Sequence, residues 1–204
     1  MKRGTLIAFE GLDGCGKSTQ LELLAAALRA AGHEVVTTRE PTRGAMGQRI
    51  RAMARSGEVV APEEELRWFV EDRREHVRDT IEPALAAGRV VLTDRYTLSS
   101  VAYQGARGLD PGEILRAGEA EFPLPDLALV FELDADAGLA RVKARGGVAE
   151  PSFEQSELLR KAEKIFESLD RPYIARIDAS PAPEVVRERV LEVVGERLAL
   201  GGRG

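Results

Sequence analysis

Apolar residues of this chain gather in five short segments, and patterns typical of amphipathic helices separate them. The segments are Leu6–Glu10, Val35–Arg39, Val90–Asp94, Leu127–Leu133 and Ile174–Asp178. Most are apolar throughout instead of alternating, which is typical of parallel strands that helices cover on both faces. The pattern predicts an α/β fold, a doubly wound sheet of five parallel strands with helices on both faces. No repeat or low-complexity linker interrupts it, so we expect one domain over residues 1–204 with a loose tail at 201–204.

Charged residues stand where each predicted strand ends. They are Glu10, Arg39-Glu40, Asp94-Arg95, Asp134 and Asp178. The carboxyl ends of parallel strands share one edge of the sheet, and ligands of open α/β sheets bind at that edge. We therefore expect a charged site there.

A phosphate-loop motif follows the first predicted strand. The segment Gly11–Ser18 reads Gly-Leu-Asp-Gly-Cys-Gly-Lys-Ser and matches G-x-x-x-x-G-K-[ST], with a helical pattern behind it. Its glycines let backbone N–H groups turn toward one anion, and the helix adds the positive end of its dipole. Lys17 can then reach the outer phosphates of a nucleoside triphosphate, while the Ser18 hydroxyl can bind Mg²⁺. The residues expected to bind this nucleotide are Gly11, Leu12, Asp13, Gly14, Cys15, Gly16, Lys17, Ser18 and Thr19.

A longer helical pattern runs from about Glu63 to Ala87. Its apolar stripe consists of Leu66, Phe69, Val70, Val77, Ile81 and Leu85, and Arg73 falls inside the stripe. An unpaired buried charge is costly, which leaves two explanations for this arginine. Either Arg73 forms a buried ion pair, or it lies in a cleft where it hydrogen bonds to a planar ligand that stacks on Phe69. Pro83 is expected to kink or shorten the last turn.

Further candidate site residues follow the third strand. An acidic residue at the end of an apolar strand beside a phosphate loop, here Asp94, commonly holds Mg²⁺ directly or through water. Arg95 is placed to bind a second phosphate, and the alternative is a surface salt bridge. If a helix begins a few residues later, then Ser99, Tyr103 and Gln104 share roughly one side of it and can face the pocket.

A basic segment, Arg141-Val142-Lys143-Ala144-Arg145-Gly146-Gly147, ends another predicted helix. Cations are favoured at a helix C-terminus by its dipole alone, without any ligand. With two glycines beside them, they also suit a mobile lid over about residues 141–156 that closes over phosphates and excludes water. We expect Arg141 and Arg145 to contact ATP there.

Composition narrows the class of protein. The formal net charge of −5 argues against a broad nucleic-acid surface. No apolar run approaches membrane-spanning length and the N-terminus lacks the apolar core of a signal peptide, so we expect no membrane partner. The single cysteine, Cys15, suits a reducing cytoplasm, which is the location that we expect.

In their combination and order these motifs resemble those of the thymidylate kinase family, and the resemblance covers essentially the whole chain. It rests on the phosphate loop, Arg39-Glu40-Pro41, Phe69 with Arg73, Asp94-Arg95-Tyr96 and Tyr103-Gln104-Gly105. The resemblance implies transfer of the γ-phosphoryl group of ATP to dTMP, giving dTDP and ADP, with Mg²⁺ as cofactor. It also implies a homodimer.

The resemblance further implies roles for single residues. Lys17, Asp94, Arg95 and Arg145 would act in catalysis, and Ser18 and Asp94 would hold Mg²⁺. The residues implied to bind dTMP are Asp13 at the sugar 3′-hydroxyl, Arg39 and Arg95 at the phosphate, Phe69 on the thymine ring, Arg73 at its O4 edge, Tyr103 against the deoxyribose, Ser99 and Gln104 in the base pocket, and Glu40. Arg145 would lie along the adenine of ATP.

One segment departs from the family pattern. Members with glycine at position 14 usually carry a catalytic arginine in a lid segment resembling Asp-Arg-Phe-Glu, whereas this chain reads Pro151-Ser152-Phe153-Glu154. Either a lid cation among Arg141, Lys143 and Arg145 moves in on closure, or Lys17, Arg95 and Mg²⁺ carry the transition-state charge with less help.

The sequence also bears on three other functions. A kinase for another nucleoside, nucleotide or small metabolite is the nearest alternative, because this fold accommodates many acceptors. A GTP-dependent switch usually recognises guanine through an Asn-Lys-x-Asp segment, which a chain without asparagine cannot contain. An interaction protein with a vestigial loop is disfavoured because every position of the phosphate-loop motif is intact.

Overall fold

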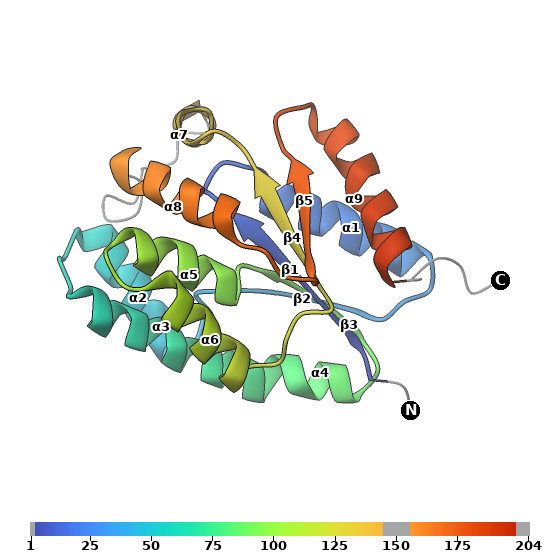
Figure 1. Ribbon diagram of the computed structural model, residues 1–204. Helices are drawn as coiled ribbons and strands as arrows, with labels where there is room; N and C mark the ends of the chain where they lie inside the picture. The colour runs from blue at the N-terminus through green and yellow to red at the C-terminus, as the bar shows by residue number, and fades with distance from the viewer. Residues whose placement is uncertain (1–2, 145–155, 199–204) are drawn as a thin grey trace.

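The computed structural model describes residues 3–144 and 156–198, in which helices flank a central parallel sheet (Figure 1). The strands are β1 (Thr5–Gly11), β2 (Val35–Arg39), β3 (Val90–Asp94), β4 (Leu127–Glu132) and β5 (Ile174–Asp178). Their spatial order is β2-β3-β1-β4-β5, and every neighbouring pair is parallel. The predicted doubly wound α/β fold is therefore confirmed. The tail expected at 201–204 lies outside the described residues.

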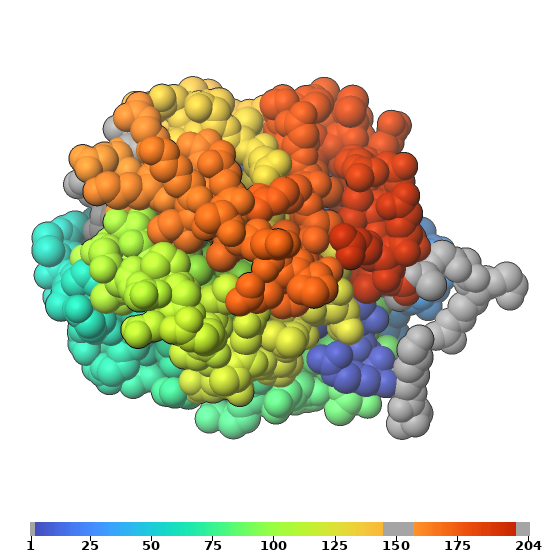
Figure 2. Space-filling view, in the orientation of Figure 1, coloured from blue at the N-terminus to red at the C-terminus, as the bar shows by residue number. Residues whose placement is uncertain are grey.

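Helices cover both faces of this sheet. On one face pack α1 (Lys17–Ala30) and α9 (Pro183–Leu198). The other face carries α2 (Ala45–Ser56), α3 (Pro62–His76), α4 (Glu82–Ala86), α5 (Thr97–Ala106), α6 (Pro111–Glu121) and α8 (Ser156–Ser168). A further helix, α7 (Ala135–Ala144), follows β4. The space-filling view shows α8, in orange, packed beside the green α5–α6 region, with the red α9 at the right (Figure 2).

Strand β1 shows why the predicted strands lack a polar face. Leu6 and Ala8 belong to the core beneath α2–α6 and α8, whereas Ile7 and Phe9 belong to the core beneath α1 and α9. All four side chains are at most 1% exposed. Side chains alternate across a strand, so a strand covered on both faces needs an apolar residue at every position.

The strand register brings the predicted polar residues together. Asp94 at the end of β3 lies beside Phe9 of β1 on one side and beside Arg39 of β2 on the other. Glu10 and Gly11 complete β1 at the same edge. The charged ends of three strands that are remote in sequence thus become neighbours.

The long predicted helix is continuous but changes its winding before Pro83. After α3, residues Val77–Ile81 form a π-helical turn, and α4 then continues to Ala86. A proline has no N–H to donate, and its ring clashes with the carbonyl four residues earlier in an α-helix. A wider π turn accommodates such a residue without breaking the helix. The proline therefore changes the helix locally and does not end it.

Two other helices begin as their sequences suggest. α3 has Pro62 and α6 has Pro111 in the first turn, where the missing N–H costs nothing. At α6 the Asp110 side chain also accepts a hydrogen bond from the Glu113 N–H at 2.9 Å. Across residues 3–144 and 156–198 the helices are too short or too polar to span a bilayer.

Candidate active site

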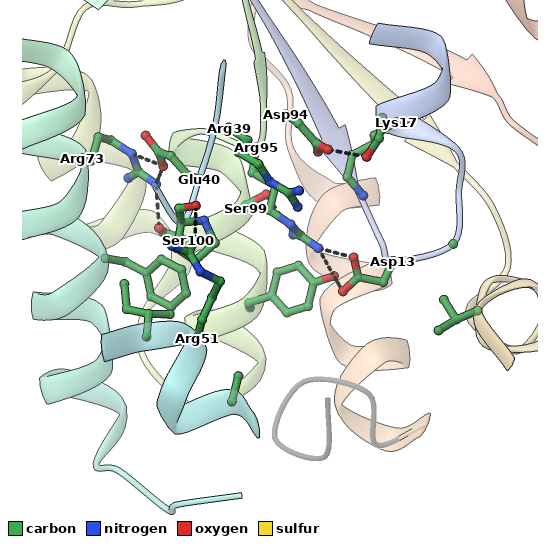
Figure 3. A pocket seen from close by; sticks show the side chains of 18 of the residues that line it. Asp13, Lys17, Arg39, Glu40, Arg51, Arg73, Asp94, Arg95, Ser99 and Ser100 are labelled. Atoms are coloured by element: carbon green, nitrogen blue, oxygen red, sulfur yellow. Dashed lines mark hydrogen bonds and ion pairs between the residues drawn. The ribbon is translucent and has the colours of Figure 1, made fainter. Parts of the chain in front are cut away.

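A cavity of about 600 Å³ opens at the carboxyl ends of β1, β2 and β3 (Figure 3). Its walls come from the phosphate loop, the segment after β2, α2, α3, and the segment from the end of β3 into α5. The predicted site residues that line it are Asp13, Gly14, Gly16, Lys17, Ser18, Thr19, Arg39, Glu40, Phe69, Arg73, Asp94, Arg95, Ser99, Tyr103 and Gln104. One hollow thus joins the phosphate loop to the aromatic residue and the inward arginine of α3.

Some predicted nucleotide-binding residues lie outside these walls. Leu12 and Cys15 are buried in the two apolar cores, and Gly11 is buried at the end of β1. The guanidinium of Arg141 donates to the carbonyls of Ala179 at 2.9 Å and Ser180 at 3.0 Å, on the β5–α9 connection. Arg145 and the departing segment at Ser152 lie outside the described residues, as does most of the expected lid.

The cavity is cationic although the chain is acidic. Six basic residues line it in the described part of the chain: Lys17, Arg39, Arg43, Arg51, Arg73 and Arg95. Three acidic residues line it as well, namely Asp13, Glu40 and Asp94. This local excess of positive charge favours polyanionic ligands, although the chain as a whole carries a formal net charge of −5.

Lys17 is held against the phosphate loop at the start of α1. Its Nζ donates to the carbonyls of Gly11 at 3.0 Å and Leu12 at 2.6 Å, and its side chain is buried. Gly16, which precedes the helix, has a φ of 94°, in the left-handed region that glycine adopts without strain. The loop therefore presents both an ammonium group and the first N–H groups of a helix to the cavity.

The oxygens of Ser18 and Asp94 meet at the same place. The Ser18 hydroxyl donates to Asp94 Oδ2 at 2.5 Å, which links the start of α1 to the end of β3. Hydroxyl and carboxylate oxygens are ligands that Mg²⁺ prefers, and it usually keeps several waters and substrate phosphates besides. Among the described residues no group of three or more His, Cys, Asp or Glu side chains is arranged to hold a metal ion.

Arg95 connects the phosphate loop with α5. Its Nη2 donates to Asp13 Oδ1 at 2.6 Å and to the Tyr103 hydroxyl at 3.2 Å, and its Nη1 donates to Ser99 Oγ at 3.2 Å. Its φ of 73° is unusual for a residue with a side chain, and such strain persists where the surroundings impose it. Arg95 thus forms an ion pair with Asp13, and because both residues line the cavity and the Arg95 side chain is only 16% exposed, this is not a simple surface salt bridge.

Charges in this group reinforce one another. Burial acts to raise the pKa of Asp13, but Arg95 and Lys17 beside it bring that pKa below its ordinary value. Burial acts to lower the pKa of Arg95, yet Asp13 and Tyr103 hold it well above the usual range. Both groups are therefore charged at neutral pH, which leaves a fixed guanidinium facing the cavity.

Glu10 fixes the segment that follows Arg95 through three hydrogen bonds in the protein interior. Its Oε1 accepts hydrogen bonds from the N–H groups of Tyr96 and Leu98, both at 3.0 Å, and its Oε2 accepts from Ser99 Oγ at 2.5 Å. The side chain is fully buried, and burial raises its pKa to about 7 from an ordinary 4.5. Sequence reasoning noted Glu10 at the strand end but assigned it no role.

We expect Glu10 to make the stability of the protein depend on pH. A carboxyl group whose pKa rises on folding stabilises the folded state fully below its unfolded pKa, and this contribution is lost as pH rises through its folded pKa. Wild-type protein should therefore lose stability relative to Glu10→Gln between about pH 4.5 and pH 7, the window set by the two pKa values. Urea unfolding at several pH values measures the difference between the two proteins.

The exposed residue Glu196 on α9 offers a matched control for removing one carboxylate, as Glu196→Gln. If the free energies of unfolding of wild type and Glu10→Gln run parallel from pH 4.5 to 8, Glu10 does not titrate in this window.

Arg73 forms one of the two arrangements that its sequence left open, and it also borders the cavity. It forms a buried ion pair, with Nε and Nη2 donating to Glu40 Oε2 at 2.9 and 2.7 Å, and its side chain is 2% exposed. It also lines the cavity together with Phe69. Burial acts to lower the pKa of Arg73, but Glu40 raises it, so the guanidinium remains charged.

The far end of the cavity suits a flat polar ligand. Phe69 is half-buried there, and the buried Gln104 side chain lines the same cavity beside Glu65. An aromatic face, an amide and a guanidinium can together bind the ring and edge of a nucleobase.

Comparison with known proteins identifies the family. The family model described as thymidylate kinase matches residues 9–190. A protein of Desulfotalea psychrophila named thymidylate kinase is 44% identical over 197 residues, covering 97% of each chain. The chain belongs to the thymidylate kinase family. Proteins of the same name from Akkermansia muciniphila and Xanthomonas euvesicatoria are each 43% identical, over 97% and 96% of this chain and 94% and 85% of their own.

In this member of the thymidylate kinase family, the structure explains why position 14 is glycine. Gly14 has a φ of 85°, and a Cβ built on it would lie 2.2 Å from the carbonyl oxygen of Gly138 in α7. A Cβ on Gly138 would in turn lie 2.7 Å from the carbonyl oxygen of Asp13. The phosphate loop and α7 thus touch backbone to backbone, so an arginine at position 14 would require this helix to move.

Two arginines of the site were missed in the sequence. Arg43 and Arg51 line the cavity, and Arg51 Nη1 donates to the carbonyl of Pro41 at 2.8 Å. In α2 the helical spacing places Arg51 on the same side as Gly47 and Ala54, both of which are buried. That spacing was a usable signal for an inward arginine, as it was for Arg73.

Two charged strand ends do not join the cavity. Asp134 accepts hydrogen bonds from the N–H groups of Asp136 and Ala137, both at 3.0 Å, and so caps α7. Asp178 accepts from the Ser180 N–H at 2.9 Å in the turn before α9. The expectation of a charged site holds for β1, β2 and β3, while the acidic residues after β4 and β5 stabilise local turns.

Proposed function

We propose that this protein transfers the γ-phosphoryl group of ATP to dTMP, giving dTDP and ADP, in deoxythymidine nucleotide biosynthesis. The observation that carries the proposal is the single cavity that joins Lys17 to Phe69 and Arg73. A phosphate loop at one end suits a triphosphate donor, and a base-sized pocket at the other suits a monophosphate acceptor. The relatives named thymidylate kinase support dTMP as that acceptor.

The acceptor lies with its base at α3 and its phosphate toward the phosphate loop. Phe69 stacks on thymine, Arg73 donates to its O4 edge, and Ser99 and Gln104 complete the base pocket. Tyr103 packs against the deoxyribose and Asp13 binds its 3′-hydroxyl. Arg39 and Arg95 bind the phosphate, and Arg51, which faces the same space, adds a third guanidinium there. Glu40 acts through Arg73.

The reaction itself needs positioning and charge neutralisation. A phosphate oxygen of dTMP attacks the γ-phosphorus of ATP, so no protein nucleophile is required. Lys17 and Arg95 surround the group in transfer and stabilise the charge on its oxygens. Ser18 and Asp94 would hold Mg²⁺, which neutralises phosphate charge when it is bound. A cation from the lid adds to the positive charges around the transferring phosphoryl group. We propose Arg145 for that role and for contact with adenine.

The acceptor is the part of the proposal that an assay tests most directly. Purified protein with ATP and Mg²⁺ should release ADP fastest with dTMP when dTMP, dUMP, dCMP, dAMP and GMP are supplied separately. A pocket built around the O4 edge should reject dCMP, which carries an amino group at that position, more strongly than dUMP. Preference for any other acceptor would establish the nearest alternative, a kinase with the same fold and a different substrate.

Two wider properties belong to the same proposal. The protein works as a homodimer, as the family resemblance implies, and light scattering that gives the mass of one chain at micromolar concentration would refute this. It works in the cytoplasm, where ATP is abundant and a free buried thiol such as that of Cys15 remains reduced. Localisation of a tagged chain in cell fractions tests the second statement.

A further inference from the structure

A buried chain of hydrogen bonds lies behind Arg73. Thr38 Oγ1 and His76 Nε2 are 2.7 Å apart, and His76 Nδ1 and Glu40 Oε1 are 3.0 Å apart. Glu40 Oε2 then accepts from Arg73 at 2.7 and 2.9 Å. The side chains of His76, Glu40 and Arg73 are at most 2% exposed. Edge strand β2 is thus connected through α3 to the guanidinium that faces the acceptor.

The roles of donor and acceptor in this chain follow from chemistry. A carboxylate oxygen only accepts, so Nδ1 of His76 carries a proton and donates it to Glu40. In the neutral ring Nε2 is then an acceptor, and the Thr38 hydroxyl donates to it. Burial acts to raise the pKa of Glu40, but Arg73 and His76 bring it below the ordinary value, so Glu40 is ionised.

His76 and Arg73 use different oxygens of Glu40. Arg73 takes Oε2 with two donors, and His76 takes Oε1. Without His76 the second oxygen would be a buried acceptor lacking its partner, and the carboxylate would be free to rotate about its last bond. Rotation of the carboxylate would draw the arginine with it, because both donors on that oxygen belong to Arg73.

One nitrogen of the Arg73 guanidinium, Nη1, is left to bind a ligand. Nη2 also donates to the carbonyl of Tyr96 and to Ser100 Oγ, both at 3.0 Å, in addition to Glu40. None of these bonds uses Nη1, and the side chain lines the cavity (Figure 3). The direction in which Nη1 points therefore depends on the Glu40 carboxylate together with Tyr96 and Ser100, and Glu40 is the partner that holds both Nε and Nη2.

We propose that His76 is a positioning residue for the acceptor base, which acts through Glu40 to aim the guanidinium of Arg73. The proposal rests on the proposed function, because it assumes that Arg73 contacts the base of dTMP. His76 touches neither nucleotide and takes no part in the transfer of the phosphoryl group.

Removing both ring nitrogens should weaken acceptor binding and leave the chemistry intact. In His76→Leu the KM for dTMP should rise about ten-fold, as expected for a misdirected charged hydrogen bond. The KM for ATP and kcat at saturating dTMP should stay within about two-fold of wild type, since Lys17 and Arg95 are unchanged. A merely structural role would instead lower the amount of folded enzyme, and hence kcat, with both KM values unaltered.

Two amide substitutions at His76 distinguish the contact of Nδ1 with Glu40 from the contact of Nε2 with Thr38. The amide nitrogen of asparagine can replace Nδ1, and that of glutamine can replace Nε2, while both are neutral and polar. His76→Asn should therefore keep the donor to Glu40 and a KM for dTMP near that of wild type. His76→Gln should resemble His76→Leu, and Thr38→Val should have a smaller effect than either.

The outcomes separate this proposal from the function on which it rests. Wild-type protein that does not phosphorylate dTMP would refute the function itself. If wild type is active on dTMP but His76→Leu leaves the KM for dTMP unchanged, the positioning role is wrong. It is equally wrong if His76→Asn and His76→Gln raise that KM alike, because position of the donor would then not matter. Thermal melts of each variant establish that the comparisons use folded protein.

Discussion

Replacing Lys17 by alanine is expected to lower kcat for dTMP phosphorylation by about 100-fold or more, the effect of removing one preorganised charge from a transition state. The Nζ of Lys17 is held by the carbonyls of Gly11 and Leu12 within the phosphate loop, so the charge is in place before a nucleotide binds. The side chain is buried, where solvent screens its interactions little. Steady-state assays with saturating ATP and dTMP measure the loss.

Lys161 provides the matched control for this substitution. It lies on α8 in an exposed pair with Glu157, with Nζ 2.9 Å from the carboxylate. Lys161→Ala removes one lysine as well, together with an exposed ion pair that solvent screens, and it should not affect turnover. A Lys17→Ala enzyme with turnover close to that of wild type would refute the catalytic role of this lysine.

The second large effect is expected at Arg95, where alanine should lower kcat/KM for dTMP by about 1,000-fold, as loss of an arginine at a transferring phosphoryl group does in related chemistry. Arg95 connects Asp13, Tyr103 and Ser99, so it orders the acceptor side as well as carrying charge. Asp13 would be left without its guanidinium partner. The assay varies dTMP at saturating ATP.

The unusual backbone of Arg95 allows strain and chemistry to be separated. Glycine adopts a φ of 73° readily, whereas alanine does not. Arg95→Gly should therefore unfold at a higher temperature than Arg95→Ala while losing as much activity. Arg189→Ala, which removes an exposed arginine paired with Glu192 on α9, controls for the loss of one positive charge. If Arg95→Gly keeps most of the activity, the guanidinium is not needed for transfer.

Much of the fold was predictable because its signals are local. The three central strands β1, β3 and β4 were recognisable by their apolar runs, because helices cover both faces of the sheet there. The phosphate loop was recognisable because its glycines must adopt left-handed backbone angles within a few residues of one another, as Gly11, Gly14 and Gly16 do. Such constraints act between neighbours in sequence and leave a readable pattern.

The sequence predicted which residues belong to the site better than it predicted which of them pair with one another. Arg73 stood out as a charge within an apolar stripe, but the sequence left open whether it was paired or faced a ligand; it forms a buried ion pair and also lines the cavity. Arg43 and Arg51 were missed because the chain has many arginines on exposed helix faces. The charged ends of β4 and β5 were expected in the site but cap local turns instead.

Sequence alone therefore determined the strands, the phosphate loop and the types of residue that meet at one edge of the sheet. These depend on hydrophobic periodicity and backbone angles, which are properties of short segments. Tertiary structure alone decided that Glu40 joins Arg73 to His76, that Glu10 holds the segment of Arg95, and that the backbone of Gly14 meets that of Gly138. Those pairings join segments far apart in the chain, and only packing brings their atoms within hydrogen-bond distance or contact.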